Sequence, residues 1–242
     1  MVLYNKKLIN FKDYKMNKIT ITKVLSLVLL SFSLGTLSQA EVKMGMSFSV
    51  MDMSPTAKEE LWSYDSESQP ADSEDIVVPM GSIFVERDLG VVSLGVDLVP
   101  YTVSSEELNN ARTAPDSSEN NTGRDLTDAK VEVQVEYPIT LYALIKNDAG
   151  AFVKLGASYA SVKTKETTPT GSQYPDTEVY GGHVAVGFEG PLGATEYNFR
   201  IEGGYSGYTN ITVANNQGSR ATKVHVNDMD GATARVSILK AF

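Results

Sequence analysis

The sequence of 242 residues contains no cysteine, one tryptophan and two histidines. The absence of cysteine excludes a disulfide framework, a thiolate metal site, a cysteine nucleophile and the lipidated cysteine of a bacterial lipoprotein. Beyond residue 40, no stretch approaches the ~20 consecutive apolar residues that a membrane-spanning helix requires. If the mature chain spans a membrane, it must therefore do so with strands.

Residues 1–40 have the composition of a secretory signal peptide. Residues 16–23 form a basic segment, residues 24–34 form a short apolar run, and small residues precede position 41. The apolar run is too short for a spanning helix. We expect a signal peptide at 1–40 and a mature domain at 41–242. The residues before Met16 fit no part of the signal, which leaves open a true start at Met16 or an extended basic region.

The mature chain is strongly acidic. Removal of residues 1–40 takes away six lysines and one aspartate, which leaves 15 basic and 29 acidic side chains and a net charge of −14. A surface of this charge argues against nucleic-acid binding.

Apolar and polar residues alternate along eight segments, as they do in strands with one apolar face. In residues 130–145, Val133, Ile139 and Leu141 share one parity, and Gln134 lies on the other. The expected strands are residues 42–50, 77–87, 92–98, 130–145, 152–162, 178–189, 196–208 and 232–242.

Pro138 interrupts the longest of these strands. Proline cannot donate to a strand ladder, so we expect a β-bulge there. The apolar parity continues through the proline, and we expect the same face on both sides of it. A turn at Tyr137-Pro138, which would add strands, is the alternative.

The connections alternate between short and long. Tight turns are expected near 88–90, 147–150 and 190–193, and polar loops at 52–75, 100–128, 164–177 and 209–230. An up-and-down barrel inserted from one side keeps its near-side turns short and lets its far-side loops grow. A soluble β-sandwich or jelly roll has no reason to sort its loops in this way. The sequence therefore predicts an all-β, eight-stranded antiparallel transmembrane barrel.

The last segment alternates apolar Ala234, Val236, Ile238 and Phe242 with more polar positions. With the signal peptide and the loop pattern, residues 41–242 resemble the small outer-membrane barrels of the OmpA/OmpX type, a porin-like family. The resemblance implies location in the cell outer membrane, contact with its lipid, and recognition by the barrel-assembly machinery through a C-terminal signal at Val236, Ile238 and Phe242. Lys240 departs from the family's apolar residue at that position, and its side chain can extend to the periplasmic interface. We expect a monomer.

The expected inward faces carry charges of both signs. An eight-stranded barrel is only wide enough for its own side chains to fill, and an unpaired buried charge is costly. We therefore expect a salt-bridge network that plugs the lumen, in preference to a proton or ion pathway. Its expected members are Lys43, Glu86, Asp97, Glu132, Glu136, Lys154, Arg200, Glu202 and Arg235, with Glu202, Glu132 or Glu136 between the two arginines.

The two histidines offer little chemistry. His225, with Asp228, Asp230 and Ser219 nearby, is the one grouping comparable to the His–Ser or His–Asp pairs of outer-membrane lipid enzymes. Loops rich in such residues produce it by chance, so we interpret it as a solvated loop. We expect His183 to be a hydrogen-bonded lumen residue, and we predict no catalytic residue, metal site or cofactor.

The loop at 52–75 is acidic but has no calcium-loop spacing, and Leu61 and Trp62 within it are candidates for contact with the interface or a partner. Tyrosines near strand ends are expected in interfacial girdles. They are Tyr101, Tyr137, Tyr159, Tyr197, Tyr205 and Tyr208.

These observations predict a structural or surface-interaction role without catalysis. A narrow porin-like channel for small solutes and an outer-membrane lipid-modifying enzyme are the alternatives. The sequence identifies no surface ligand.

Overall fold

In the computed structural model, the described residues are 7–8, 41–60, 72–73, 75–104, 108–112, 127–167, 173–216 and 223–242. Among them, no helix is long and apolar enough to cross a membrane.

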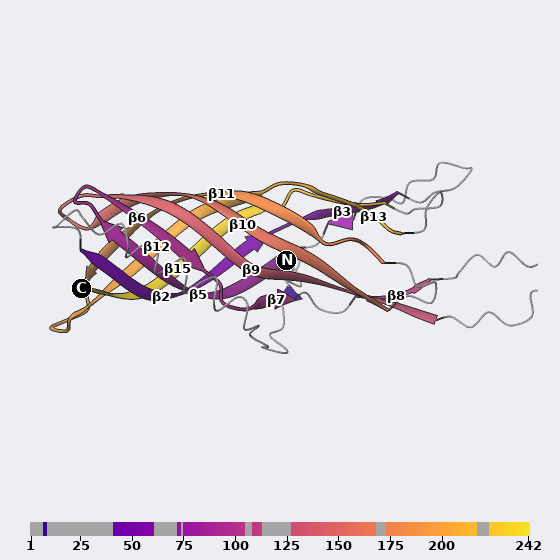
Figure 1. The fold of residues 1–242 in the computed structure, drawn as a ribbon, viewed down its shortest axis with the longest axis horizontal. Helices are drawn as coiled ribbons and strands as arrows, with labels where there is room; N and C mark the ends of the chain where they lie inside the picture. Colours follow the sequence, from indigo (N-terminus) through magenta and orange to yellow (C-terminus); the bar gives the residue numbers. More distant parts are fainter. Residues whose placement is uncertain are drawn as a thin grey trace, which may run out of the picture.

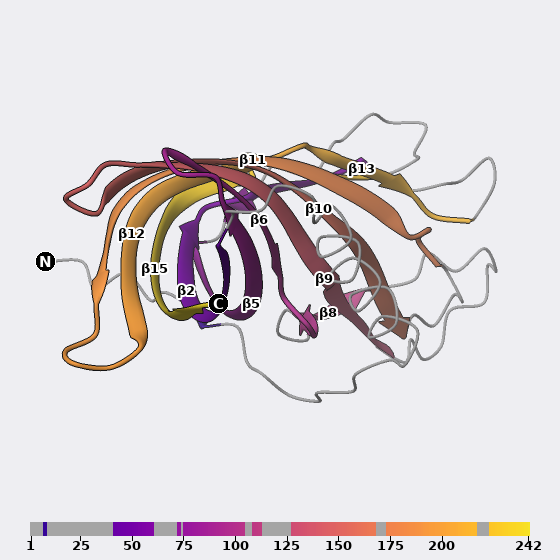
Figure 2. The same cartoon turned by 60° about the vertical axis from the view of Figure 1, so that its left-hand side comes forward.

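Eight long strands in the described part of the chain form a closed antiparallel barrel (Figures 1 and 2). Each pairs with the next along the chain, and pairing of β15 with β2 closes the cylinder. The expected fold is confirmed. The barrel strands are β2 (Val42–Met53), β5 (Ile76–Asp88), β6 (Val92–Leu98), β9 (Thr127–Lys146), β10 (Ala151–Thr167), β11 (Thr177–Pro191), β12 (Tyr197–Tyr208) and β15 (Asp230–Ala241).

The short turns and the C-terminus lie at one end of the barrel (Figure 1). At the β5–β6 turn, Gly90 has φ +97° and its N–H donates to Asp88 Oδ1 at 2.9 Å. Asn147 caps the β9–β10 turn by accepting from Ala151 N at 3.0 Å. Phe242 N donates to Val42 O at 2.8 Å, which joins the last described residue to the start of β2.

The opposite end carries short strands where the sequence predicts only loops. A second sheet runs β13-β14-β3-β4, and β7 and β8 extend the ladder on β9. The expectation of irregular loops at 52–75, 100–128 and 209–230 is therefore wrong in part. These strands have two to five residues, and even where alternation exists, as in Ile211-Thr212-Val213, it is too short to stand out from a polar loop. Leu61, Trp62 and Ser219 lie outside the described residues. The short strands are β1 (Lys7–Leu8), which pairs in parallel with β5, β3 (Thr56–Glu60), β4 (Asp72–Ser73), β7 (Thr102–Ser104), β8 (Leu108–Arg112), β13 (Ile211–Ala214) and β14 (Lys223–Asn227).

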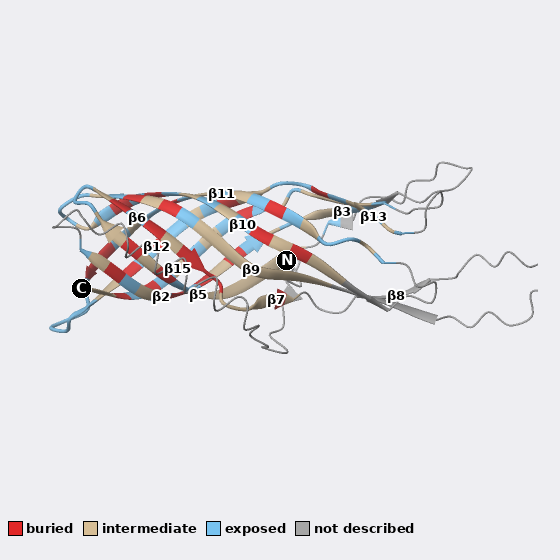
Figure 3. Ribbon diagram, in the orientation of Figure 1, coloured by how far each residue is buried: buried red, intermediate tan, exposed pale blue. Residues whose placement is uncertain are grey.

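Burial alternates along the barrel strands in the sense opposite to that of a soluble protein (Figure 3). Large apolar side chains such as Met46 (67% exposed) and Val186 (60%) point outward, whereas charged side chains such as Arg200 (2%) are buried. Exposed aliphatic rows around a polar interior suit lipid outside and side-chain packing inside. This pattern argues against the soluble β-sandwich, whose aliphatic rows would meet in a core.

Pro138 lies in a β-bulge, as expected. Ile139 pairs with Tyr159 and Glu136 pairs with Ser161, so Tyr137 and Pro138 together face the single residue between those partners. Tyr137 has φ +46°. The alternative turn at this position is thereby excluded, because β9 continues through it.

The expectation that the same face continues through Pro138 is wrong. Val135 pairs with Val162 and packs inward, whereas Leu141, on the same parity, is exposed outside. The bulge inserts one residue and so exchanges the two faces. On the short-turn side of the bulge, the outer face of the barrel contacts lipid. On the external side of the bulge, the outer face contacts water, and the apolar residues point inward.

An apolar cluster, which we call the external cap, lies on the external side of the bulge. Its buried members come from β10, β11 and β13, and further residues from β9, β13, β14 and the link between β14 and β15 pack against them. The cap consists of Ala160, Val162, Val179, Ile211, Val133, Val135, Val213, Val226 and Met229.

Candidate functional site: a charged plug in the lumen

Six charged side chains form a network near the short-turn end of the lumen, which we call the first tier. Lys43 Nζ lies 2.5 Å from Asp88 Oδ2 and 3.4 Å from Glu189 Oε1. Lys146 Nζ lies 2.9 Å from the same Glu189 oxygen. The members are Lys43, Glu86, Asp88, Lys146, Glu189 and Arg200.

Arg200 is the centre of the first tier. Its Nη1 and Nη2 donate to the two Glu86 oxygens at 3.0 and 3.1 Å, and its Nε donates to Glu189 at 3.1 Å. The planar guanidinium matches a carboxylate in this two-bond geometry. The rings of Phe84 and Phe152 each lie 5.4 Å from the guanidinium carbon, within the range of cation–π attraction.

A second tier lies further from the short turns. Lys154 Nζ donates to both oxygens of Glu202, at 2.8 and 3.1 Å. Arg235 Nε lies 3.1 Å from Glu202 Oε1, and its Nη1 donates to Asp97. Glu202 therefore bridges two cations from β10 and β15.

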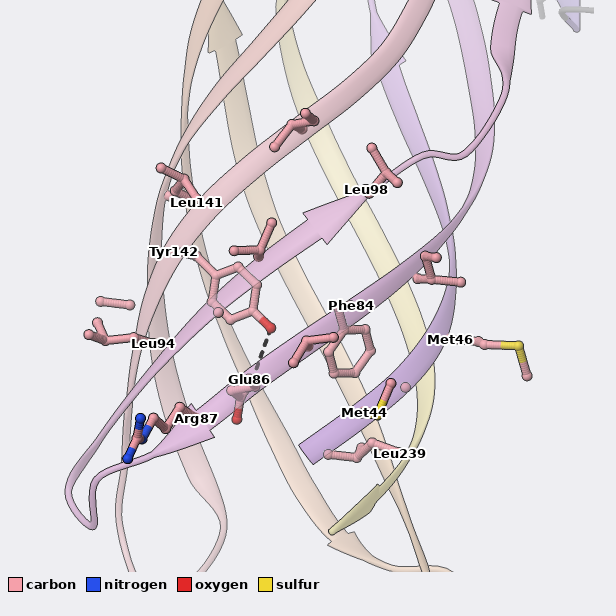
Figure 4. A pocket seen from close by; sticks show the side chains of 18 of the residues that line it. Met44, Met46, Phe84, Glu86, Arg87, Leu94, Leu98, Leu141, Tyr142 and Leu239 are labelled. Carbon is pink, nitrogen blue, oxygen red and sulfur yellow. Dashed lines mark hydrogen bonds between the residues drawn. The ribbon is translucent and has the colours of Figure 1, made fainter. Parts of the chain in front are cut away.

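Tyr142 connects the tiers. Its hydroxyl donates to Glu86 Oε2 at 3.0 Å, the bond drawn in Figure 4. The Lys154 ammonium lies 4.6 Å from the centre of the same ring. One aromatic side chain thus contacts an acid of the first tier and a base of the second.

Each tier is balanced in formal charge. The first has three cations and three carboxylates, and the second has two of each. Removing one member would leave a buried charge without compensation, which is the costly case for ion pairs in a low-dielectric interior.

The structure brings seven of the nine expected lumen residues into these tiers. Glu136 is a correction: the bulge directs it outward, where it lies 2.9 Å from Lys163. The pKa of Lys163 is raised by this hydrogen bond. Glu132 pairs through its backbone with Lys165, and its side chain lies outside the described residues. The seven are Lys43, Glu86, Asp97, Lys154, Arg200, Glu202 and Arg235.

Sequence reasoning missed Asp88, Lys146, Glu189 and Tyr142 as network members. Glu189 occupies the inward parity of an expected strand, so its alternation with Phe188 was a usable signal. Asp88 and Lys146 adjoin turns, where alternation ends. Glu202 does contact Arg235, but Arg200 takes its partners, Glu86 and Glu189, from β5 and β11.

The histidines are not brought into one site. His183 Nδ1 lies 2.8 Å from Ser206 Oγ in the lumen, as expected. His225 lies on β14, 3.1 Å from Thr212 Oγ1, whereas Asp230 accepts a hydrogen bond from Tyr205. Among the residues that the structure describes, no group of three or more His, Asp or Glu side chains could hold a metal ion.

The aromatic side chains at the ends of the barrel fit interfacial girdles with one correction. The ring centres of Tyr159 and Tyr180 lie 5.5 Å apart with the rings tilted by 55°, and both hydroxyls donate to Glu178 on the external side. Tyr197 is exposed near the short turns. Tyr208, in contrast, faces the lumen, with its ring over Gly181.

No protein-family model and no curated protein matches the sequence. Among solved structures, the chain is similar to the outer membrane protein OprG from Pseudomonas aeruginosa, at 12% identity over 84% of this chain and 96% of that one, with a TM-score of 0.52. The outer membrane protease OmpT from Escherichia coli aligns at 8% identity, over 83% and 97% of the chains, with a TM-score of 0.43. The Yersinia pestis attachment invasion locus protein Ail aligns at 8%, over 84% and 99%, with a TM-score of 0.39.

The likeness to OprG agrees with the closed cylinder and its outward apolar rows. The chain has the fold of the small outer-membrane β-barrels, and its location is the outer membrane.

Proposed function

We propose that this barrel is a non-catalytic, non-conducting anchor that holds its external strands and loops at the cell surface for a structural or interaction role. The charged plug is the observation that carries the proposal. Ten lumen side chains from all eight barrel strands pair in two balanced tiers, and the external cap lies above them. A permeating ion would have to displace pairs whose separation is costly.

The external sheet supports the surface role. β14 pairs with both β13 and β3, which connects the segment after β12 to the segment after β2. Ile211 and Val226 on one face belong to the external cap. The opposite face, which includes Thr212 and Lys58, is directed away from the cap, so the apolar cap supports a polar surface.

Planar-bilayer recording of the purified mature chain tests the proposal against the narrow-channel alternative. We expect no stepwise conductance from the wild type. The Lys154→Ala, Glu202→Ala double variant removes one charge of each sign and most of two side chains from the second tier, and serves as a positive control for an opened lumen. Discrete wild-type conductance steps that this double variant alters would overturn the proposal.

The enzyme alternative has its own test. Lipase and acyl-transfer assays on the folded protein should show no activity above that of the boiled chain. Activity that disappears on His225→Ala, with folding retained, would contradict a non-catalytic role.

A further inference from the structure

A groove of 1490 Å³ crosses the lipid-facing wall of the barrel from the short-turn end toward the external side. Its walls come from β2, β5, β6, β9, β10, β12 and β15, and Met44, Met46, Ile83 and Leu94 are among its exposed apolar residues. Small-molecule pockets are typically ~300–1,000 Å³ and enclosed. An open, larger groove facing the hydrocarbon suits acyl chains.

Cationic side chains lie at one end of this groove. The relevant positions are the outward ones of the described barrel strands between the level of Tyr159 and the short turns. The charged residues there are Arg87 and Lys240, and both line the groove. Acidic outward residues, such as Glu178, occur on the external side. On the strands themselves, the outward charges nearest the periplasmic leaflet are therefore cationic, and the adjoining turn carries the exposed acid Glu196.

The two cations flank the start of β2. Arg87 on β5 pairs with Val42, and Lys240 on β15 pairs with Met44. Figure 4 shows Arg87 at the end of β5, with Leu94 above it and Met44 on the neighbouring strand. The apolar surface thus continues directly from the guanidinium.

Lys240 pairs with a residue of the adjoining turn. Its ammonium lies 2.5 Å from Glu196, an exposed turn residue whose pKa it lowers, and 5.5 Å from the Phe242 ring. An exposed ion pair of this kind contributes little and exchanges partners readily. We assign the main headgroup contact to Arg87, because a guanidinium can donate two parallel bonds to a phosphate.

We propose that this groove binds an anionic phospholipid of the periplasmic leaflet. The phosphate lies on Arg87, Lys240 adds a second positive charge, and the acyl chains lie against Met44, Met46, Ile83 and Leu94. A headgroup with net negative charge is favoured over a zwitterionic one, because both charged side chains of the barrel wall at the site are cations, and the exposed pair between Lys240 and Glu196 of the adjoining turn exchanges partners readily.

Native mass spectrometry of the mature chain in detergent, titrated with phosphatidylglycerol, tests this site. We expect one retained lipid, and Arg87→Gln should weaken its binding roughly tenfold, the loss expected for one charge-assisted contact. Lys163→Gln, which removes a cation at the external end of the groove, is the matched control and should bind as the wild type does. Equal binding by Arg87→Gln and Lys163→Gln would overturn the proposal.

A second measurement does not depend on the folding of a variant. The wild type should retain phosphatidylglycerol in preference to phosphatidylcholine when both are present at equal concentration. Retention without preference would remove the basis for a headgroup site. The shift in gel migration between unboiled and boiled samples verifies that each variant is folded.

Discussion

Gly95 on β6 lies directly opposite Tyr142 on β9, and the tyrosine ring occupies the space that a side chain at position 95 would need. The same relationship holds between Gly45 and Phe84 on β2 and β5. These glycines let two aromatic rings lie flat against the barrel wall. One ring carries the hydroxyl that connects the tiers, and the other adjoins Arg200.

Gly95→Ala should therefore destabilise the barrel by about 1–3 kcal/mol, the usual cost of overpacking. The added methyl would displace Tyr142 and weaken its bond to Glu86. Urea unfolding in lipid vesicles measures the effect. Gly203→Ala is the control, because a Cβ there meets only Thr233 O at 4.0 Å. Equal stability of the two variants would contradict the packing role of Gly95.

Arg200→Leu should destabilise the barrel by about 3–5 kcal/mol, because Glu86 and Glu189 would remain as buried carboxylates without their main partner. Arg235→Leu should also weaken it, but less, since the Arg235 side chain is 19% exposed and that of Arg200 is 2% exposed. Urea midpoints of both variants test the order. An unchanged midpoint for Arg200→Leu would mean that the first tier does not stabilise the fold.

Much of the fold follows from the sequence because lipid imposes a period of two on every outward row. Met46, Val186 and Ile238 could be assigned outward on this basis alone. Which charges meet across the lumen depends on strand stagger, and alternation within one strand does not encode stagger. Arg200 on β12 therefore pairs with Glu86 on β5, a strand that does not adjoin β12. The alternation within either strand could not have predicted this pairing.

Glu136 illustrates a second limit. The sequence alternates without interruption through Pro138, yet the environment reverses there from lipid outside to water outside. The bulge exchanges the two faces of the strand at the point where the surroundings change from lipid to water, so the two changes hide each other in the sequence pattern. Residues of one parity therefore point outward on the short-turn side of Pro138 and inward on the external side. A residue-by-residue pattern cannot separate that case from a straight strand.

Deletion of Pro138 tests the role of the bulge. Without the extra residue, Val133 and Val135 would turn outward into water and Glu136 would turn toward the external cap. We expect the membrane part of the barrel to fold and the strand above it to lose protection, which hydrogen exchange of residues 133–137 measures. Pro138→Val retains the residue count and should preserve protection. Equal protection in both variants would show that the number of residues at the bulge does not determine which face of β9 points outward beyond it.

Phe242 and Lys240 bear on assembly. Phe242 is outward, 70% exposed, and joined by its backbone to Val42, so Phe242→Ala keeps the backbone contacts that close the barrel while removing the aromatic end of the C-terminal signal. We expect slower appearance of the heat-modifiable folded form in cells and an unchanged urea midpoint of the purified, refolded protein. Lys240→Phe should accelerate assembly, because it places an apolar residue two positions before the end. Assembly of Phe242→Ala at the wild-type rate would show that the assembly machinery does not recognise the terminal strand through the Phe242 ring.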